Sequence, residues 1–126
     1  MGMSELVSRI DYGKFFEEIM DVDPTIRFAA SYDGQFNAKY RDGIEGYFND
    51  DEVRSFLSKA QKRWDSRKQM SLKIGDPKFA MAQYGKINRI TIPLENDGVI
   101  LVTTELGADI NKLVEGIIDI RNKFFD

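Results

Sequence analysis

Two runs of alternating apolar and polar residues, separated by an Asp-Gly pair, constrain the fold of this chain more than any other feature. The first run reads, in order, Ile26, Arg27, Phe28, Ala29, Ala30, Ser31 and Tyr32. After Asp33-Gly34, the second run reads Phe36, Asn37, Ala38, Lys39, Tyr40 and Arg41. A period of two residues is typical of a β-strand, and Asp-Gly favours a tight turn. We therefore predict a β-hairpin over residues 26–41.

Two other segments repeat apolar residues every three or four positions, which is the period of an amphipathic α-helix. The first covers residues 8–22 and ends before Pro24, because a proline disfavours the helical conformation of the residue before it. The second starts at Asp109 and places Ile110, Leu113, Val114, Ile117 and Phe124 on one face. These segments predict one helix before the hairpin and one helix at the end of the sequence.

A third helix is predicted between them, over residues 50–74. The Asn49 side chain can cap its first turn, while Glu52, three residues later, completes a capping box. Phe56, Leu57, Ala60 and Trp64 continue the helix as one apolar stripe. Gly75 and then Pro77 end it.

Three strand-like runs follow, over residues 79–84, 87–94 and 99–104. Their connections are short, so we expect an antiparallel meander. Residues 99–102 are apolar at every position, which is typical of a central strand covered on both faces. The predicted fold class is α+β, with the order α-β-β-α-β-β-β-α.

Composition excludes most catalytic chemistry. The chain has 126 residues, which favours a single domain over residues 1–126, and it has no cysteine and no histidine. Disulfides, thiolate or imidazole metal sites and His- or Cys-dependent catalytic residues are therefore excluded. We predict a protein that is not an enzyme, with no catalytic residue, no cofactor and no metal. Neither a signal segment nor a membrane helix is evident, so we expect a cytoplasmic protein without a membrane partner.

Charge is distributed unevenly along the chain. The formal net charge is −3, which argues against a nucleic-acid-binding protein. Residues 54–78, however, contain eight basic and two acidic residues. Within this stretch we identify a candidate partner-binding sector next to the apolar stripe, formed by Lys59, Lys62, Arg63 and Arg67. Such a sector can bind an acidic partner, and the simpler alternative is a solvated helix face.

The predicted order of helix, hairpin, long helix, three-strand meander and helix covers nearly the whole chain. Within it, residues 26–34 form a strand that leads into a turn glycine, and residues 99–104 form an apolar strand before the last helix. Together these features resemble the roadblock/LC7 group of profilin-like domains. More narrowly, residues 64–68, 73–75 and 84–87 are similar to small archaeal roadblock-like proteins.

This resemblance implies a five-stranded antiparallel sheet of order 2-1-5-4-3, flanked by helices, and a homodimer that pairs through the third strand and the second helix. On this sequence those elements are residues 79–84 and 50–74. The implied interface residues are Phe56, Ala60, Trp64, Phe79, Met81 and Gln83. Independently, an edge strand without an internal proline favours pairing with another chain.

For function, the resemblance implies a noncatalytic scaffold that tethers or regulates a small GTPase or another NTPase. The alternative is a small-ligand sensory domain of PAS or profilin-like shape. In that alternative, a pocket of several hundred cubic ångströms would be lined by the strand and loop tyrosines Tyr32, Tyr40, Tyr47 and Tyr84.

Overall fold

A computed structural model describes residues 10–125 of the chain. Its elements, in order, are α2 (Tyr12–Val22), β1 (Ile26–Tyr32), β2 (Phe36–Tyr40), α3 (Asp50–Lys68), α4 (Ser71–Ile74), β3 (Ala80–Gln83), β4 (Ile87–Pro93), β5 (Val99–Glu105) and α5 (Ile110–Phe125). The strands form one antiparallel sheet of order β2-β1-β5-β4-β3. The predicted fold class, element order and strand order are confirmed.

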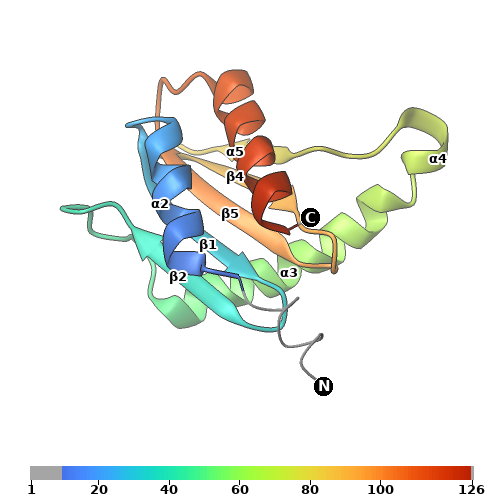
Figure 1. Ribbon diagram of the computed structural model, residues 1–126, viewed down its shortest axis with the longest axis horizontal. Helices are drawn as coiled ribbons and strands as arrows, with labels where there is room; N and C mark the ends of the chain where they lie inside the picture. The colour runs from blue at the N-terminus through green and yellow to red at the C-terminus, as the bar shows by residue number, and fades with distance from the viewer. Residues whose placement is uncertain (1–9, 126) are drawn as a thin grey trace.

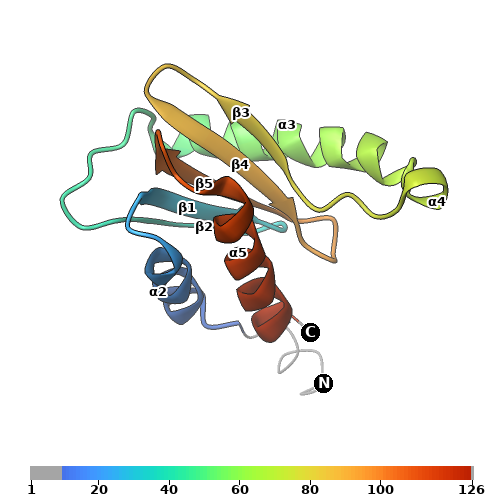
Figure 2. The ribbon, with the colours of Figure 1, turned by 90° about the horizontal axis from the view of Figure 1, so that it is seen from above.

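Three layers make up the molecule, as Figures 1 and 2 show: α2 and α5 cover one face of the sheet, and α3 covers the other. Each face has its own apolar cluster. One cluster joins α2 and α5 to the sheet, and the other joins Val53, Leu57, Ala60 and Trp64 of α3 to it. The central strand β5 is buried along almost its whole length, because helices lie on both of its faces.

The β1 strand departs from simple alternation. Ile26 pairs with Thr104 while Phe28 pairs with Thr103, so Arg27 is an extra residue in a β-bulge. As a result, Ile26 packs with α2 and α5, whereas Phe28 and Ala30 pack under α3. The alternating pattern alone would put Ile26 and Phe28 on one face, and the bulge is the reason that they are not.

The start of α3 follows the prediction. The Asn49 side-chain oxygen accepts a hydrogen bond from the Glu52 backbone N–H at 2.8 Å, and the Glu52 carboxylate accepts one from the Asn49 N–H at 3.0 Å. Three acidic residues occupy the first turn, where the helix dipole favours negative charge. In α2, Asp11 caps the helix through the Lys14 N–H. The predicted start at Ser8 lies outside the described residues.

The predicted end of the long helix is wrong. The helix stops at Lys68 and the chain turns before the separate four-residue helix α4, rather than continuing to Ile74. The last buried side chain of α3 is Trp64, and α4 buries no residue at all. Tertiary packing supplies most helix stability in proteins, so a helix without a sheet beneath it has little to keep it straight and continuous.

Candidate functional site

The β3 strand is an open edge of the sheet. It pairs with β4 on one side and lies at the end of the strand order, as Figure 2 shows. Met81, which is 42% exposed, lies opposite Ile90 and belongs to the face covered by α5. Gln83 is exposed, and Phe79 and Tyr84 at the strand ends are also exposed. An edge of this kind presents free backbone N–H and C=O groups to a second strand.

Beside this edge lies one flank of α3. Phe56 is half-buried on it, and the guanidinium of Arg89 in β4 stacks on the Phe56 ring at 4.8 Å. Residues 56, 59, 63 and 67 follow one another at spacings of three or four, so they share this flank. The opposite flank faces β2, where Arg54 stacks on Phe36. The α3 flank and the β3 edge therefore form one continuous surface.

Two of the predicted interface residues lie beneath this surface rather than on it. Ala60 is 2% exposed and Trp64 is 1% exposed, and both pack against the sheet in their own chain. The Trp64 indole N–H donates a hydrogen bond to the Thr91 hydroxyl at 3.1 Å. These side chains have almost no surface to offer a second copy, and their contribution is to hold α3 in place. Phe56, Phe79, Met81 and Gln83 keep accessible surface.

The predicted partner-binding residues divide into two groups. Lys59, Lys62 and Arg63 are exposed and form no ion pair within residues 10–125. Arg67 is half-buried, and its guanidinium stacks on the Trp64 ring at 5.0 Å. Arg67 therefore covers the tryptophan with its side chain, and the free positive charge of the helix is concentrated in the other three residues.

Charge also changes along α3. The first turn carries Asp50, Asp51 and Glu52, and the last turn carries Arg67 and Lys68. The helix thus has an acidic beginning and a basic end. Two such helices placed side by side in antiparallel orientation would bring opposite charges together at both ends.

Solved structures with the same architecture exist. An MglB with a tetrameric arrangement superposes with a TM-score of 0.70 and 9% identity, covering 90% of this chain and 87% of that chain. A Roadblock/LC7 domain from Streptomyces avermitilis gives a TM-score of 0.67 and 11% identity, with coverages of 92% and 94%. The gliding protein MglB from Thermus thermophilus gives 0.64 and 11%, with both coverages at 88%. No family model and no curated protein matches the sequence.

This chain has the roadblock/LC7 fold. The predicted resemblance is confirmed at the level of the fold, which is what similarity at such low identity establishes. The narrower likeness to archaeal proteins stays a prediction.

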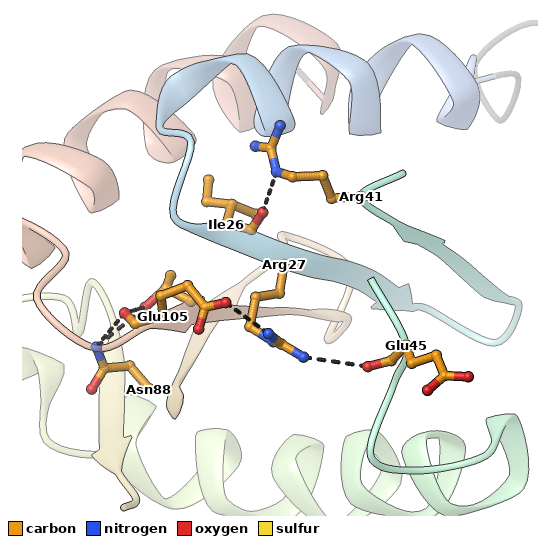
Figure 3. A network of polar contacts seen from close by, with 7 residues as sticks. Ile26, Arg27, Arg41, Glu45, Asn88 and Glu105 are labelled. Carbon is orange, nitrogen blue, oxygen red and sulfur yellow. Dashed lines mark hydrogen bonds and ion pairs between the residues drawn. The ribbon is translucent and has the colours of Figure 1, made fainter. Parts of the chain in front are cut away.

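Two arginines stabilise this roadblock/LC7 fold in a way that the sequence pattern did not reveal. As Figure 3 shows, Arg41 reaches toward α2 and Arg27 toward the opposite side of the sheet. Arg41 donates hydrogen bonds to the carbonyl oxygens of Ile26 at 2.6 Å, Met20 at 2.7 Å and Asp23 at 3.0 Å, and so binds the end of α2 to the hairpin. In the alternating pattern, Arg41 looks like an ordinary solvent-facing strand residue.

Arg27 occupies the bulge and connects three segments. Its guanidinium pairs with the Glu105 carboxylate at 2.7 Å and donates to the Glu45 carbonyl at 3.3 Å (Figure 3). It also stacks on the Tyr47 ring at 5.2 Å. Arg27 therefore fixes the loop that precedes α3. The sequence carries no signal of this role, because Ile26, Arg27 and Phe28 alternate regularly and the bulge appears only in the pairing with β5.

A pocket of this roadblock/LC7 fold lies between that loop, α3 and the sheet. Tyr40 and Tyr47 line it together with Arg27, Phe28, Ile44, Gly46, Phe48, Val53, Phe56, Ile87, Arg89, Leu101 and Thr103. Its volume is about 30 Å³, room for roughly one or two water molecules. Ligand sites usually have about 300–1,000 Å³. The pocket is thus too small to favour the sensory alternative, and Tyr32 and Tyr84 are not among its lining residues.

Within residues 10–125, the acidic side chains do not form a group of three that could hold a metal ion. In the same part of the chain, no helix is long and apolar enough to cross a membrane.

Proposed function

We propose that residues 1–126 form a single noncatalytic interaction domain that works as a homodimer and tethers or regulates a small GTPase or another NTPase. The observation that carries this proposal is the uncovered β3 edge beside the exposed flank of α3. The roadblock/LC7 fold supports it, since members of that group often act as regulators or scaffolds for NTPases. We propose that the domain works in the cytoplasm.

In the proposed dimer, β3 of each copy pairs with β3 of the other, and the two α3 helices run antiparallel on the same face. In a two-fold symmetric interface each contact occurs twice, with the roles of the two copies exchanged. The acidic first turn of each α3 then lies toward the basic last turn of its partner. Phe56, Phe79, Met81 and Gln83 supply the exposed contact surface.

The partner-binding face in this proposal is formed by Lys59, Lys62 and Arg63, with Arg67 at its border. Their positive charges, which form no ion pair within residues 10–125, fit an acidic surface on the NTPase. Regulation follows only if the domain binds the two nucleotide states of its partner with different affinity, because a ligand shifts an equilibrium by its differential affinity alone.

Light scattering of the purified chain tests the dimer. We expect a mass twice the chain mass of 14.5 kDa, falling toward the single-chain value on dilution. The Met81→Glu variant places two carboxylates in the paired edge and should remain monomeric. Lys39→Glu, a substitution at a partly exposed position of the opposite edge strand β2, is the matched control and should leave the dimer intact. A monomeric wild-type chain at high concentration contradicts the proposal.

Nucleotide-dependent capture tests the partner. The immobilised dimer is incubated with native lysate in the presence of GDP, a non-hydrolysable GTP analogue, or no nucleotide, and bound proteins are identified by mass spectrometry. We expect an NTPase whose recovery depends on the nucleotide. The Lys62→Glu/Arg63→Glu variant should lose this capture, most strongly at low salt, because salt screens exposed charges over about 8–10 Å. Lys14→Glu/Lys112→Glu, on the helices of the opposite layer, is the matched control. Equal capture by both variants would rule out this face.

A further inference from the structure

The segment of residues 69–79, which we call the arm, leaves the end of α3, passes through α4 and returns to β3. Figures 1 and 2 show α4 at the end of α3, projecting beyond the sheet and away from α2 and α5. Three apolar side chains in it are exposed to solvent: Met70 (57%), Leu72 (98%) and Ile74 (78%). Clustered exposed apolar residues on a protein with an ordinary core mark an interaction site.

Next to the arm is an open groove of about 1090 Å³. The arm residues Asp76, Pro77, Lys78 and Phe79 line one wall, with Lys68 and Ser71. The other wall is built by α5 and the β4–β5 connection and consists of Pro93, Leu94, Glu95, Asn111, Val114, Glu115, Ile118, Asp119 and Arg121. Its volume lies just above the range of about 300–1,000 Å³ that is usual for small-ligand sites, so the groove has room for several side chains.

The exposed apolar side chains at the tip of the arm do not line this groove in their own chain. Ser71 lines the groove, but Leu72 and Ile74 do not. The groove and the apolar tip are therefore two unoccupied surfaces of the same chain.

These two surfaces are complementary in chemistry. The groove offers the partly exposed side chain of Ile118 and the exposed ring of Phe79, beside the carboxylates of Glu95, Glu115 and Asp119. Leu94 and Val114 also line it but are each only 3% exposed, and the basic residues Lys68, Lys78 and Arg121 lie on its walls. Those three carboxylates form no ion pair within residues 10–125. The tip offers its aliphatic side chains on either side of Lys73, which is exposed and also unpaired in that range.

We propose that the arm tip, residues 70–74, of one copy binds in the groove between the arm and α5 of a second copy. In this contact Leu72 and Ile74 pack against Ile118 and the exposed Phe79 ring, and the Lys73 ammonium lies near the carboxylates of Glu95, Glu115 and Asp119. A reciprocal exchange places the two arms side by side, because each arm forms part of the groove that receives the other. This contact adjoins the proposed β3–α3 interface, since Phe79 belongs to both, but Leu72, Ile74 and Ile118 lie outside that interface and the contact does not rest on it.

The absence of native cysteine gives a direct test. Leu72→Cys is mixed with an Ile118→Cys chain that carries a larger tag, so that a disulfide between unlike copies is resolved by mass. Disulfide formation requires the two Cα atoms to come within about 7 Å. We expect a mixed crosslink in high yield, far above that of Leu72→Cys mixed with Gln35→Cys, an exposed control in the β1–β2 turn. Equal yields in the two mixtures overturn the proposal.

A chain carrying both Leu72→Cys and Ile118→Cys distinguishes exchange from folding back. Exchange predicts intermolecular disulfides at high concentration. An intramolecular disulfide that forms equally well at every dilution would place the tip in its own groove and overturn the proposal.

Substitutions test the chemistry of the contact. Leu72→Ser should weaken the association measured by mixed crosslinking, through Ile74→Cys and Ile118→Cys, by about tenfold or more, because it removes most of one buried aliphatic side chain. Lys73→Glu should weaken it more at low salt than at high salt, whereas Lys59→Glu on α3 should not. Unchanged crosslinking in both tip variants would contradict the proposal.

Two further outcomes separate this contact from other interactions. The crosslink should persist in the Met81→Glu background even if the β3 edge is the main dimer interface, so the two proposals can fail separately. Loss of the crosslink in that background overturns the independence of the arm contact. Flotation with phosphatidylserine vesicles that depends on Leu72 and Ile74, without mixed crosslinking, would assign the tip to a lipid surface instead.

Discussion

The hydrogen bond between Trp64 and Thr91 supports a quantitative prediction about how α3 is held on the sheet. Trp64 is the only tryptophan of the chain, is 1% exposed, and donates its indole N–H to the Thr91 hydroxyl at 3.1 Å. The Thr91→Val substitution keeps the branched shape of the side chain and its preference for a strand, but removes the acceptor. The indole N–H is then buried without a partner.

An unsatisfied buried donor costs about 1–3 kcal/mol of stability. Thr91 is half-buried, so water can reach part of this site, and we expect about 1–2 kcal/mol of lost unfolding free energy. With a guanidinium m-value of about 3 kcal/mol per molar, the unfolding midpoint should fall by about 0.3–0.7 M. Tryptophan fluorescence reports the transition directly, because this one indole moves from the interior to water. The m-value should not change.

Two controls make the prediction specific. Thr91→Ser keeps the hydroxyl and should lose less stability than Thr91→Val. In a Trp64→Phe background, followed by circular dichroism, Thr91→Val should cost nothing, because no indole N–H remains to be satisfied. The reasoning is refuted if valine leaves the midpoint of the wild-type chain unchanged, or if it costs the same in both backgrounds.

Three further substitutions test other contacts. Arg41→Ala should lower the unfolding free energy by about 2–4 kcal/mol, since it removes three charge-assisted hydrogen bonds, two to the end of α2 and one to Ile26 in β1. Arg41→Lys should recover less than half of this loss in denaturant titrations. Asn49→Ala should cost about 1 kcal/mol by removing the cap of α3, with Asn49→Ser close to wild type in the same assay. Hydrogen bonds from Thr25 hold the pKa of the Asp23 carboxyl below its ordinary value. The ionised carboxylate therefore stabilises the fold fully at pH values above its ordinary pKa, and this stabilisation is lost as the pH falls through the lowered pKa. Thr25→Val should thus be less stable than wild type at pH 7, and thermal melts should show this difference shrinking toward about pH 2. A difference in stability that stays constant at all pH values would contradict this prediction.

Local signals in the sequence were sufficient for most of the architecture. The hairpin over β1 and β2, the Asn49 cap and the apolar β5 strand each depend on neighbouring residues, and the structure contains all three. The candidate surface was predicted less completely. The exposed β3 edge and the exposed residues Lys59, Lys62 and Arg63 lie where the pattern indicated, but their binding roles stay predictions.

Other features depended on what lies across the sheet or beneath a helix. Trp64 and Phe56 belong to the same apolar stripe of the sequence, yet Trp64 is buried and Phe56 lies on the flank. Spacing along a helix fixes which side chains share a face, but the position of the sheet decides which of them lose contact with water.

The sequence by itself determined the order and type of the elements, because caps, turns and hydrophobic periods act between residues close together in the chain. Only the tertiary structure decided the bulge at Arg27, the Arg41 bonds to α2, the break after Lys68 and the groove beside α5. Each of these arises where segments distant in sequence meet, or where a helix extends past the sheet that would support it. Such encounters are set by the packing of the whole chain, and a local pattern contains no record of them.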